Sequence, residues 1–103
     1  MNQAQLMAQM RKMQQEMERV QDELKSTTVT GSAGGNAVSV SINGDFRVQK
    51  VTLGKEAVDP DDIETLEDLL VVALNDAIGN VQELSGRKMG ALTGGMKIPG
   101  MHT

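Results

Sequence analysis

The stretch that decides the fold runs from residue 38 to residue 53 and reads VSVSINGDFRVQKVTL. Apolar and polar residues alternate through its first half, which is typical of a half-buried strand. Asn43-Gly44 then predicts a type I′ hairpin turn, in which both central residues adopt positive φ. The apolar phase of the return strand slips by one residue between Val48 and Val51, which indicates a β-bulge at Gln49-Lys50. The stretch therefore predicts two antiparallel strands.

The residues on the N-terminal side of this hairpin predict a further strand and, before it, a helix. Residues 26–30 are rich in Thr and Val and are expected to be extended, and residues 31–36 are expected to form a loop or a bulged turn. Between about residues 2 and 26 the apolar side chains follow a strict 3.5-residue repeat. The repeat consists of Leu6, Met10, Met13, Met17, Val20 and Leu24. Such a narrow seam is typical of a helix that pairs with one other helix.

A second helix is predicted on the C-terminal side, from about residue 60 to 86. Asp59 suits its N-cap and Pro60 its first position. Residues 69–74 are apolar almost all round, so we expect one side to face the sheet and the other a second protomer. Gly86 or Gly90 is expected to end the helix. The tail, residues 87–103, is too rich in glycine for a stable helix and too apolar for an ordinary linker.

These elements form a single domain over residues 1–103 of the α+β class. The predicted order is α-β-β-β-α, with a three-stranded antiparallel meander flanked by long helices. A chain this short buries only about two-thirds of its unfolded surface. Its excess apolar surface therefore predicts an obligate homodimer.

The composition excludes several classes of function. There is no cysteine and only one histidine, His102, so disulfides, thiolate nucleophiles, cysteine-ligated metals and histidine-dependent triads cannot be built. No motif places a serine next to a base. We therefore expect no enzyme, no metal or other cofactor and no small-molecule substrate. Phe46 is the only aromatic residue, which removes any platform for stacking bases.

The apolar stretches are too short to span a membrane, and the first residues are polar and do not resemble a signal peptide. The expected location is the cytoplasm.

The charge pattern leaves two interpretations open. The net charge is −4, which by itself argues against nucleic-acid binding. The charge is uneven, however, because residues 45–83 carry net −7 and residues 87–103 carry net +3. Arg11, Gln15 and Arg19 recur every four residues and are expected on the helix face away from the seam, where they could follow DNA phosphates. The alternative is a solvated face with ion pairs between residues four apart.

Several stretches together resemble the YbaB/EbfC family of bacterial nucleoid-associated proteins. They are MNQAQLMAQM at residues 1–10, MQQEM at 13–17, VSING at 40–44, LEDLLVVALNDA at 66–77 and KMGALTGGMKIPGM at 88–101. The resemblance implies an α-β-β-β-α protomer, a homodimer joined through its central region, and helices that project as a pair of arms. It also implies a non-enzymatic protein that binds double-stranded DNA, shapes the nucleoid and influences transcription.

The family's DNA contacts are placed on the projecting helices. The matching basic positions in this chain are Arg11, Lys12, Arg19, Lys25, Arg87 and Lys88. The alternative function is a holdase-like adaptor that binds other proteins, because a methionine-rich seam suits promiscuous apolar binding. The net charge favours this adaptor, whereas the resemblance favours DNA.

Overall fold

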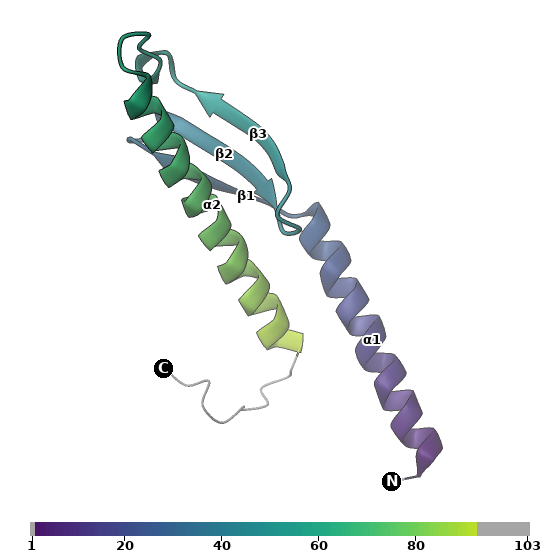
Figure 1. Ribbon diagram of the computed structural model, residues 1–103. Coiled ribbons are helices and arrows are strands. Elements are labelled where there is room, and N and C mark those ends of the chain that lie inside the picture. The colour runs from purple at the N-terminus through teal and green to yellow at the C-terminus, as the bar shows by residue number, and fades with distance from the viewer. Residues whose placement is uncertain (1, 93–103) are drawn as a thin grey trace, which may run out of the picture.

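The computed structural model describes residues 2–92 of the chain. Its elements are α1 (Gln3–Ser26), β1 (Thr28–Ala33), β2 (Val38–Asn43), β3 (Val48–Leu53), the short 3-10 helix η1 (Lys55–Ala57) and α2 (Ile63–Leu92). The order α-β-β-β-α and the antiparallel sheet confirm the predicted fold class. Figure 1 shows α2 lying against the sheet, while α1 and the end of α2 project from it in the same direction. Residues 93–103, most of the predicted tail, lie outside the described part.

The sheet is a meander in the order β1-β2-β3. Ser41 pairs with Lys50 and Ile42 pairs with Val48, so Gln49 is an extra residue on β3. This arrangement confirms the β-bulge predicted at Gln49-Lys50. β1 extends to Ala33, so the following loop begins three residues later than predicted. Gly34, Gly35 and Asn36 form that turn with positive φ.

The predicted type I′ turn at Asn43-Gly44 is wrong. Neither residue has positive φ; the residue that does is Phe46, at 61°. The amide of Phe46 donates to the carbonyl of Asn43, and the Asn43 amide donates to the carbonyl of Arg47, which makes a three-residue loop. Gly44 is required for another reason. A Cβ atom there would lie 2.7 Å from Leu24 Cβ, because the end of α1 packs directly on the loop.

The core lies between the sheet and the first two-thirds of α2. Val38, Val40 and Ile42 of β2 are fully buried against Ala73, Ala77 and Val81 of α2. The helix approaches closely because β1 presents Gly31, where a Cβ atom would lie only 2.6 Å from the Cα of Ala77. Small residues on both elements thus fix the distance between the helix and the sheet.

Both ends of α2 differ from the prediction. The helix begins at Ile63, and Asp62 caps it by accepting hydrogen bonds from the amide and hydroxyl of Thr65. Asp59 instead accepts from the amide of Asp61 in the preceding turn. At the other end, the helix passes through Gly86 and Gly90 and reaches Leu92. Each glycine in a helix interior costs about 1 kcal/mol relative to alanine, so this end of α2 is intrinsically weak.

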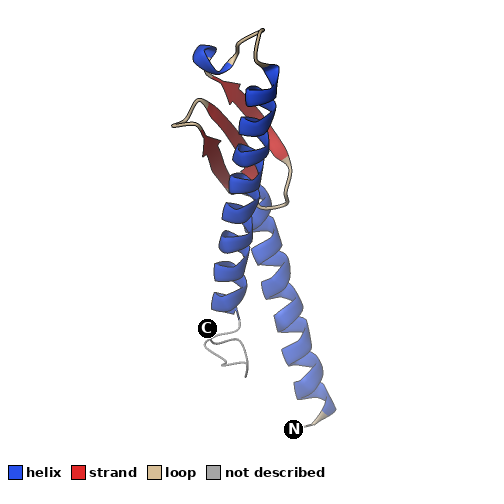
Figure 2. Cartoon of the chain, turned by 60° about the vertical axis from the view of Figure 1, so that its left-hand side comes forward, coloured by secondary structure: helices blue, strands red, loops and turns tan. Residues whose placement is uncertain are grey.

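We call the sheet and residues 63–81 of α2 the base, and residues 3–26 of α1 and 82–92 of α2 the arms. The arms make the molecule long, with extents of 70 × 29 × 16 Å and a radius of gyration of 19.4 Å. A compact chain of this length has a radius of about 13 Å. Figure 2 shows the two arms diverging from the base. α1 begins with a capping box in which Asn2 and Gln5 bond reciprocally.

Candidate nucleic-acid interface

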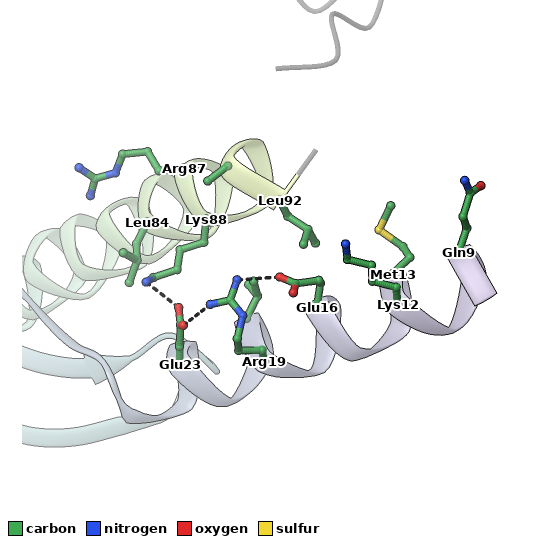
Figure 3. Close-up of a pocket in the computed structure, with 12 residues that line it drawn as sticks. Gln9, Lys12, Met13, Glu16, Arg19, Glu23, Leu84, Arg87, Lys88 and Leu92 are labelled. Atoms are coloured by element: carbon green, nitrogen blue, oxygen red, sulfur yellow. Dashed lines mark hydrogen bonds and ion pairs between the residues drawn. The ribbon is translucent and has the colours of Figure 1, made fainter. Parts of the chain in front are cut away.

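A groove of about 610 Å³ separates the two arms. α1 contributes Met13 and Val20 to its walls, and α2 contributes Leu84, Ala91 and Leu92. Charged side chains line it as well: Lys12, Glu16, Arg19, Glu23, Arg87 and Lys88. Figure 3 shows Lys88, Glu23, Arg19 and Glu16 between the two helices, with Leu92 at the end of α2 facing α1.

A chain of ion pairs joins the arms where they meet the base (Figure 3). Lys88 of α2 donates to Glu23 of α1 across 2.9 Å, between residues 65 positions apart in the sequence. The other oxygen of Glu23 accepts from Arg19, and Arg19 also donates to Glu16 at 2.9 Å. The hydrogen bond from Lys88 lowers the pKa of the Glu23 carboxyl below its ordinary value, and Arg19 adds to this effect. Glu16 raises the pKa of Arg19.

The structure separates the predicted basic residues into two groups. Lys12, Arg19, Arg87 and Lys88 are brought together around the groove. Arg11 and Lys25 lie outside it, and Gln15 lines a shallow depression beside Arg19. Arg19 lines the depression together with Gln15, Glu18 and Asp22, which are not seam residues, and it also lines the groove. α2 approaches α1 from the side that carries Glu16 and Glu23 rather than over the middle of the seam.

Ion pairing divides these cations further. Arg19 sits between Glu16 and Glu23 of its own helix, as in the alternative of a helix face with ion pairs between nearby residues. Lys88 of α2 is paired with Glu23 of α1. Within residues 2–92, Arg11, Lys12, Lys25 and Arg87 form no ion pair. The guanidinium of Arg87 points away from α1 in Figure 3. These four positive charges are therefore free to meet an anion.

Sequence reasoning missed Glu16 and Glu23 as members of this site. Their spacing of three and four residues from Arg19 was the available signal. The contact between Glu23 and Lys88 had no such signal.

A second exposed surface lies on the base. In the register of the sheet, Val51 and Leu53 share the face of Val40 and Val38, but α2 covers β1 and β2 and leaves β3 exposed. Two hydrogen bonds hold one flank of α2 to β1. The carboxylate of Asp76 accepts from the Ser32 amide, and the side chain of Asn80 donates to the Thr30 carbonyl. Val71 lies on the opposite flank, toward β3, and is 56% exposed. We call Val48, Val51, Leu53 and Val71 the uncovered apolar surface.

Comparison with known proteins identifies the family. The family model described as "YbaB/EbfC DNA-binding family" matches residues 1–96. The chain belongs to the YbaB/EbfC family. Its relatives include a nucleoid-associated protein of Chloroflexus aurantiacus, 52% identical over 94% of this chain and 97% of that protein. A nucleoid-associated protein of Roseiflexus sp. is 50% identical over 97% of this chain and 99% of its own length.

A solved structure has the same fold as this YbaB/EbfC chain. The crystal structure of an uncharacterized protein from Helicobacter pylori superposes with a TM-score of 0.80 at 28% identity, covering 91% of this chain and 99% of that one. Within residues 2–92, neither helix has an apolar stretch long enough to cross a bilayer. No group of three or more carboxylate or imidazole side chains in the same part of the chain is arranged to hold a metal ion.

Proposed function

We propose that this chain binds double-stranded DNA as a homodimer, in the nucleoid of the cytoplasm, and that it contributes to nucleoid organisation and to gene regulation. Membership of a DNA-binding family is the observation that carries this proposal. The relatives named as nucleoid-associated proteins support the location. The proposal contains no catalytic step, no cofactor and no small-molecule substrate.

The DNA contacts are assigned to the cations of the arms that have no partner. Arg11, Lys12 and Arg87 lie on the projecting helices and have no carboxylate to displace before they meet a phosphate. Lys25 and Gln15 lie on the same helix as Arg11 and assist. Arg19 and Lys88 are assigned a smaller share because Glu16 and Glu23 already balance much of their charge. Their main role is to hold the arms together.

The contacts are expected to involve phosphates rather than base edges. Lysine and arginine side chains at helix surfaces position a protein on DNA without reading its sequence. The acidic residues of the base would repel the backbone, so the base faces away from the DNA. This orientation leaves the ends of the arms as the part of each protomer nearest the duplex.

The homodimer is assigned to the uncovered apolar surface. Valine and leucine side chains on a strand and a neighbouring helix flank form the kind of patch that marks a protein interface. A second copy presents the same patch, and a two-fold axis brings the two together. Pairing through the base leaves both pairs of arms projecting and available for DNA.

A salt titration of duplex binding tests the proposed function. If three free cations per protomer each contact a phosphate, a dimer contacts about six and the log–log slope is about −5. Affinity then falls on the order of 1,000-fold between 50 and 200 mM salt. Binding that is absent at low salt, or that does not change with salt, contradicts the proposal.

The exposed methionines of α1 favour a second candidate function. Met7, Met10, Met13 and Met17 are between 43 and 59% exposed, and their flexible thioethers adapt to many apolar partners. The second candidate is a holdase-like adaptor for other proteins. It predicts suppression of aggregation of an unfolded client protein, without binding to DNA, and the same preparation can be used in both assays.

A further inference from the structure

The groove between the arms has apolar walls that nothing in residues 2–92 fills. Met13 and Val20 face Leu84, Ala91 and Leu92 across a volume within the range of ligand pockets. The cations and carboxylates near its closed end are paired with one another. The apolar walls therefore suit an apolar occupant, while Lys12 and Arg87 at the lining keep their charges free.

The chain continues from the open end of this groove. Leu92 lines the groove and is the last residue that the structure describes. The next residues, 93–103, read TGGMKIPGMHT. Gly94-Gly95 lets the chain reverse direction, since glycine adopts conformations closed to other residues. Met96, Ile98 and Met101 supply three large apolar side chains directly after this reversal.

We propose that residues 93–103 fold back and dock in the groove of their own chain, with Met96, Ile98 and Met101 against its apolar walls. The lengths agree. From Leu92 back to Leu84 is about 12 Å along a helix, and residues 96–101 span about 20 Å when extended. Methionine also suits an irregular wall because its side chain is unbranched and flexible.

The alternation of an extended chain supports this orientation for the first two anchors. Met96 and Ile98 fall on one side, toward the groove, and Lys97 falls on the other. Met101 would fall on the side of Lys97 if the alternation continued, but Gly100 interrupts it and lets Met101 turn back to the groove. Lys97 then faces solvent between the arms and is not buried. Tethering favours the chain's own tail over that of another molecule, because a short linker keeps the segment at a high effective concentration.

Disulfide trapping in the full-length chain tests this docking, since the chain has no cysteine of its own. The test variant combines Met13→Cys, inside the groove, with Ile98→Cys. The matched control combines Gln14→Cys with the same Ile98→Cys. Gln14 is the next residue of α1 and is exposed, but it does not line the groove. Both pairs are oxidised under the same mild conditions and followed on non-reducing gels.

The proposal expects the Met13 pair to form an intrachain disulfide on the order of ten times faster than the Gln14 pair. Adding Met96→Ser and Met101→Ser to the Met13 pair is expected to lower its rate to that of the control. Equal rates for the two pairs overturn the proposal. So does a disulfide that forms mainly between two chains, or a Met13 rate that the serine substitutions leave unchanged. These outcomes do not depend on whether the chain binds DNA.

Discussion

The base and the arms are stabilised in different ways. In the base, Val38, Val40, Ala73 and Ala77 are fully buried. Two hydrogen bonds join α2 to β1, one accepted by Asp76 and one donated by Asn80. In the arms, most side chains are exposed, including four of the six residues of the α1 seam. The two arms are linked by the hydrogen-bonded ion pair between Lys88 of α2 and Glu23 of α1. The base therefore carries most of the stability of the protomer.

This difference also separates the effects of mutation. A substitution in the base acts through packing and changes whether the chain folds. A substitution at an exposed position in the arms changes charge or shape at the surface and leaves the core intact. The same kind of substitution is therefore expected to have very different consequences in the two regions.

The largest effect is expected from Gly31→Val in the base. The new side chain would meet the backbone of α2 at Ala73 and Ala77, which cannot move without separating the helix from the sheet. We expect a loss of at least about 3 kcal/mol in the free energy of unfolding, measured by urea denaturation. The control is Gly86→Ala in the arm, where a Cβ atom meets open space. It is expected to gain about 1 kcal/mol. An unchanged urea midpoint for Gly31→Val would show that the contact between β1 and α2 is not rigid.

The second effect concerns the proposed dimer. Val51→Glu places a charge in the uncovered apolar surface, where pairing would bury it without a partner. Sedimentation equilibrium is expected to show loss of the dimer. Thr52→Glu, on the same strand but in register with Ser39 on the opposite face, is expected to remain dimeric. If Val51→Glu is as dimeric as the wild type, the interface lies elsewhere. A folded wild-type monomer at micromolar concentration would show that the dimer is not obligate.

Local sequence patterns predicted most of the base. Alternation of apolar residues gave β2, and the slip in phase between Val48 and Val51 located the bulge. The hairpin turn could not be predicted in the same way. Gly44 is excluded from bearing a side chain by Leu24, twenty positions earlier, and not by its own φ. The glycine at position 44 is therefore required by its packing against Leu24 and not by the turn type.

The arms show the same limit. Gly86 and Gly90 are weak helix formers, yet α2 continues through both to Leu92, so local propensity does not set the end of this helix. The ion pairs of Arg19 follow from its spacing to Glu16 and Glu23. The pairing of Glu23 with Lys88 depends on how the arms are arranged, and no spacing rule reaches across 65 residues. The candidate cations and the pairing of Arg19 were therefore predictable, but the pairing of Lys88 was not.

The third effect concerns the affinity of the arms for DNA. Arg11→Glu combined with Arg87→Glu removes two free cations from each protomer's arms. We expect about four fewer phosphate contacts per dimer and a salt slope that falls from about −5 to about −2. The expected loss of affinity is on the order of 1,000-fold at about 100 mM salt for every duplex sequence alike. Gel-shift titrations at several salt concentrations measure both quantities.

The matched control for this pair carries the same change of charge on the base. The control is Arg47→Glu combined with Lys50→Glu. Both residues are exposed, with Lys50 on β3 and Arg47 directly before it. This control is expected to change the affinity far less than the arm variant. If this control loses more affinity than the arm variant, the DNA-binding face is on the sheet and not on the arms.

The smallest effect is expected from Glu23→Gln, which breaks the link between the arms without touching the base. The folded-state pKa of Glu23 is lowered chiefly by the hydrogen bond from Lys88, so its contribution to stability is present above the ordinary carboxyl pKa. That contribution is lost as the pH falls through the lowered value. Glu18→Gln removes the same charge from α1 without breaking an ion pair.

At pH 7, amide exchange in residues 84–92 is expected to be faster in Glu23→Gln than in Glu18→Gln. In stability measurements carried down to acid pH, the difference between the two variants is expected to disappear once Glu23 is protonated in the folded protein. A difference that persists unchanged at acid pH would mean that the Glu23 carboxylate does not hold the arms together.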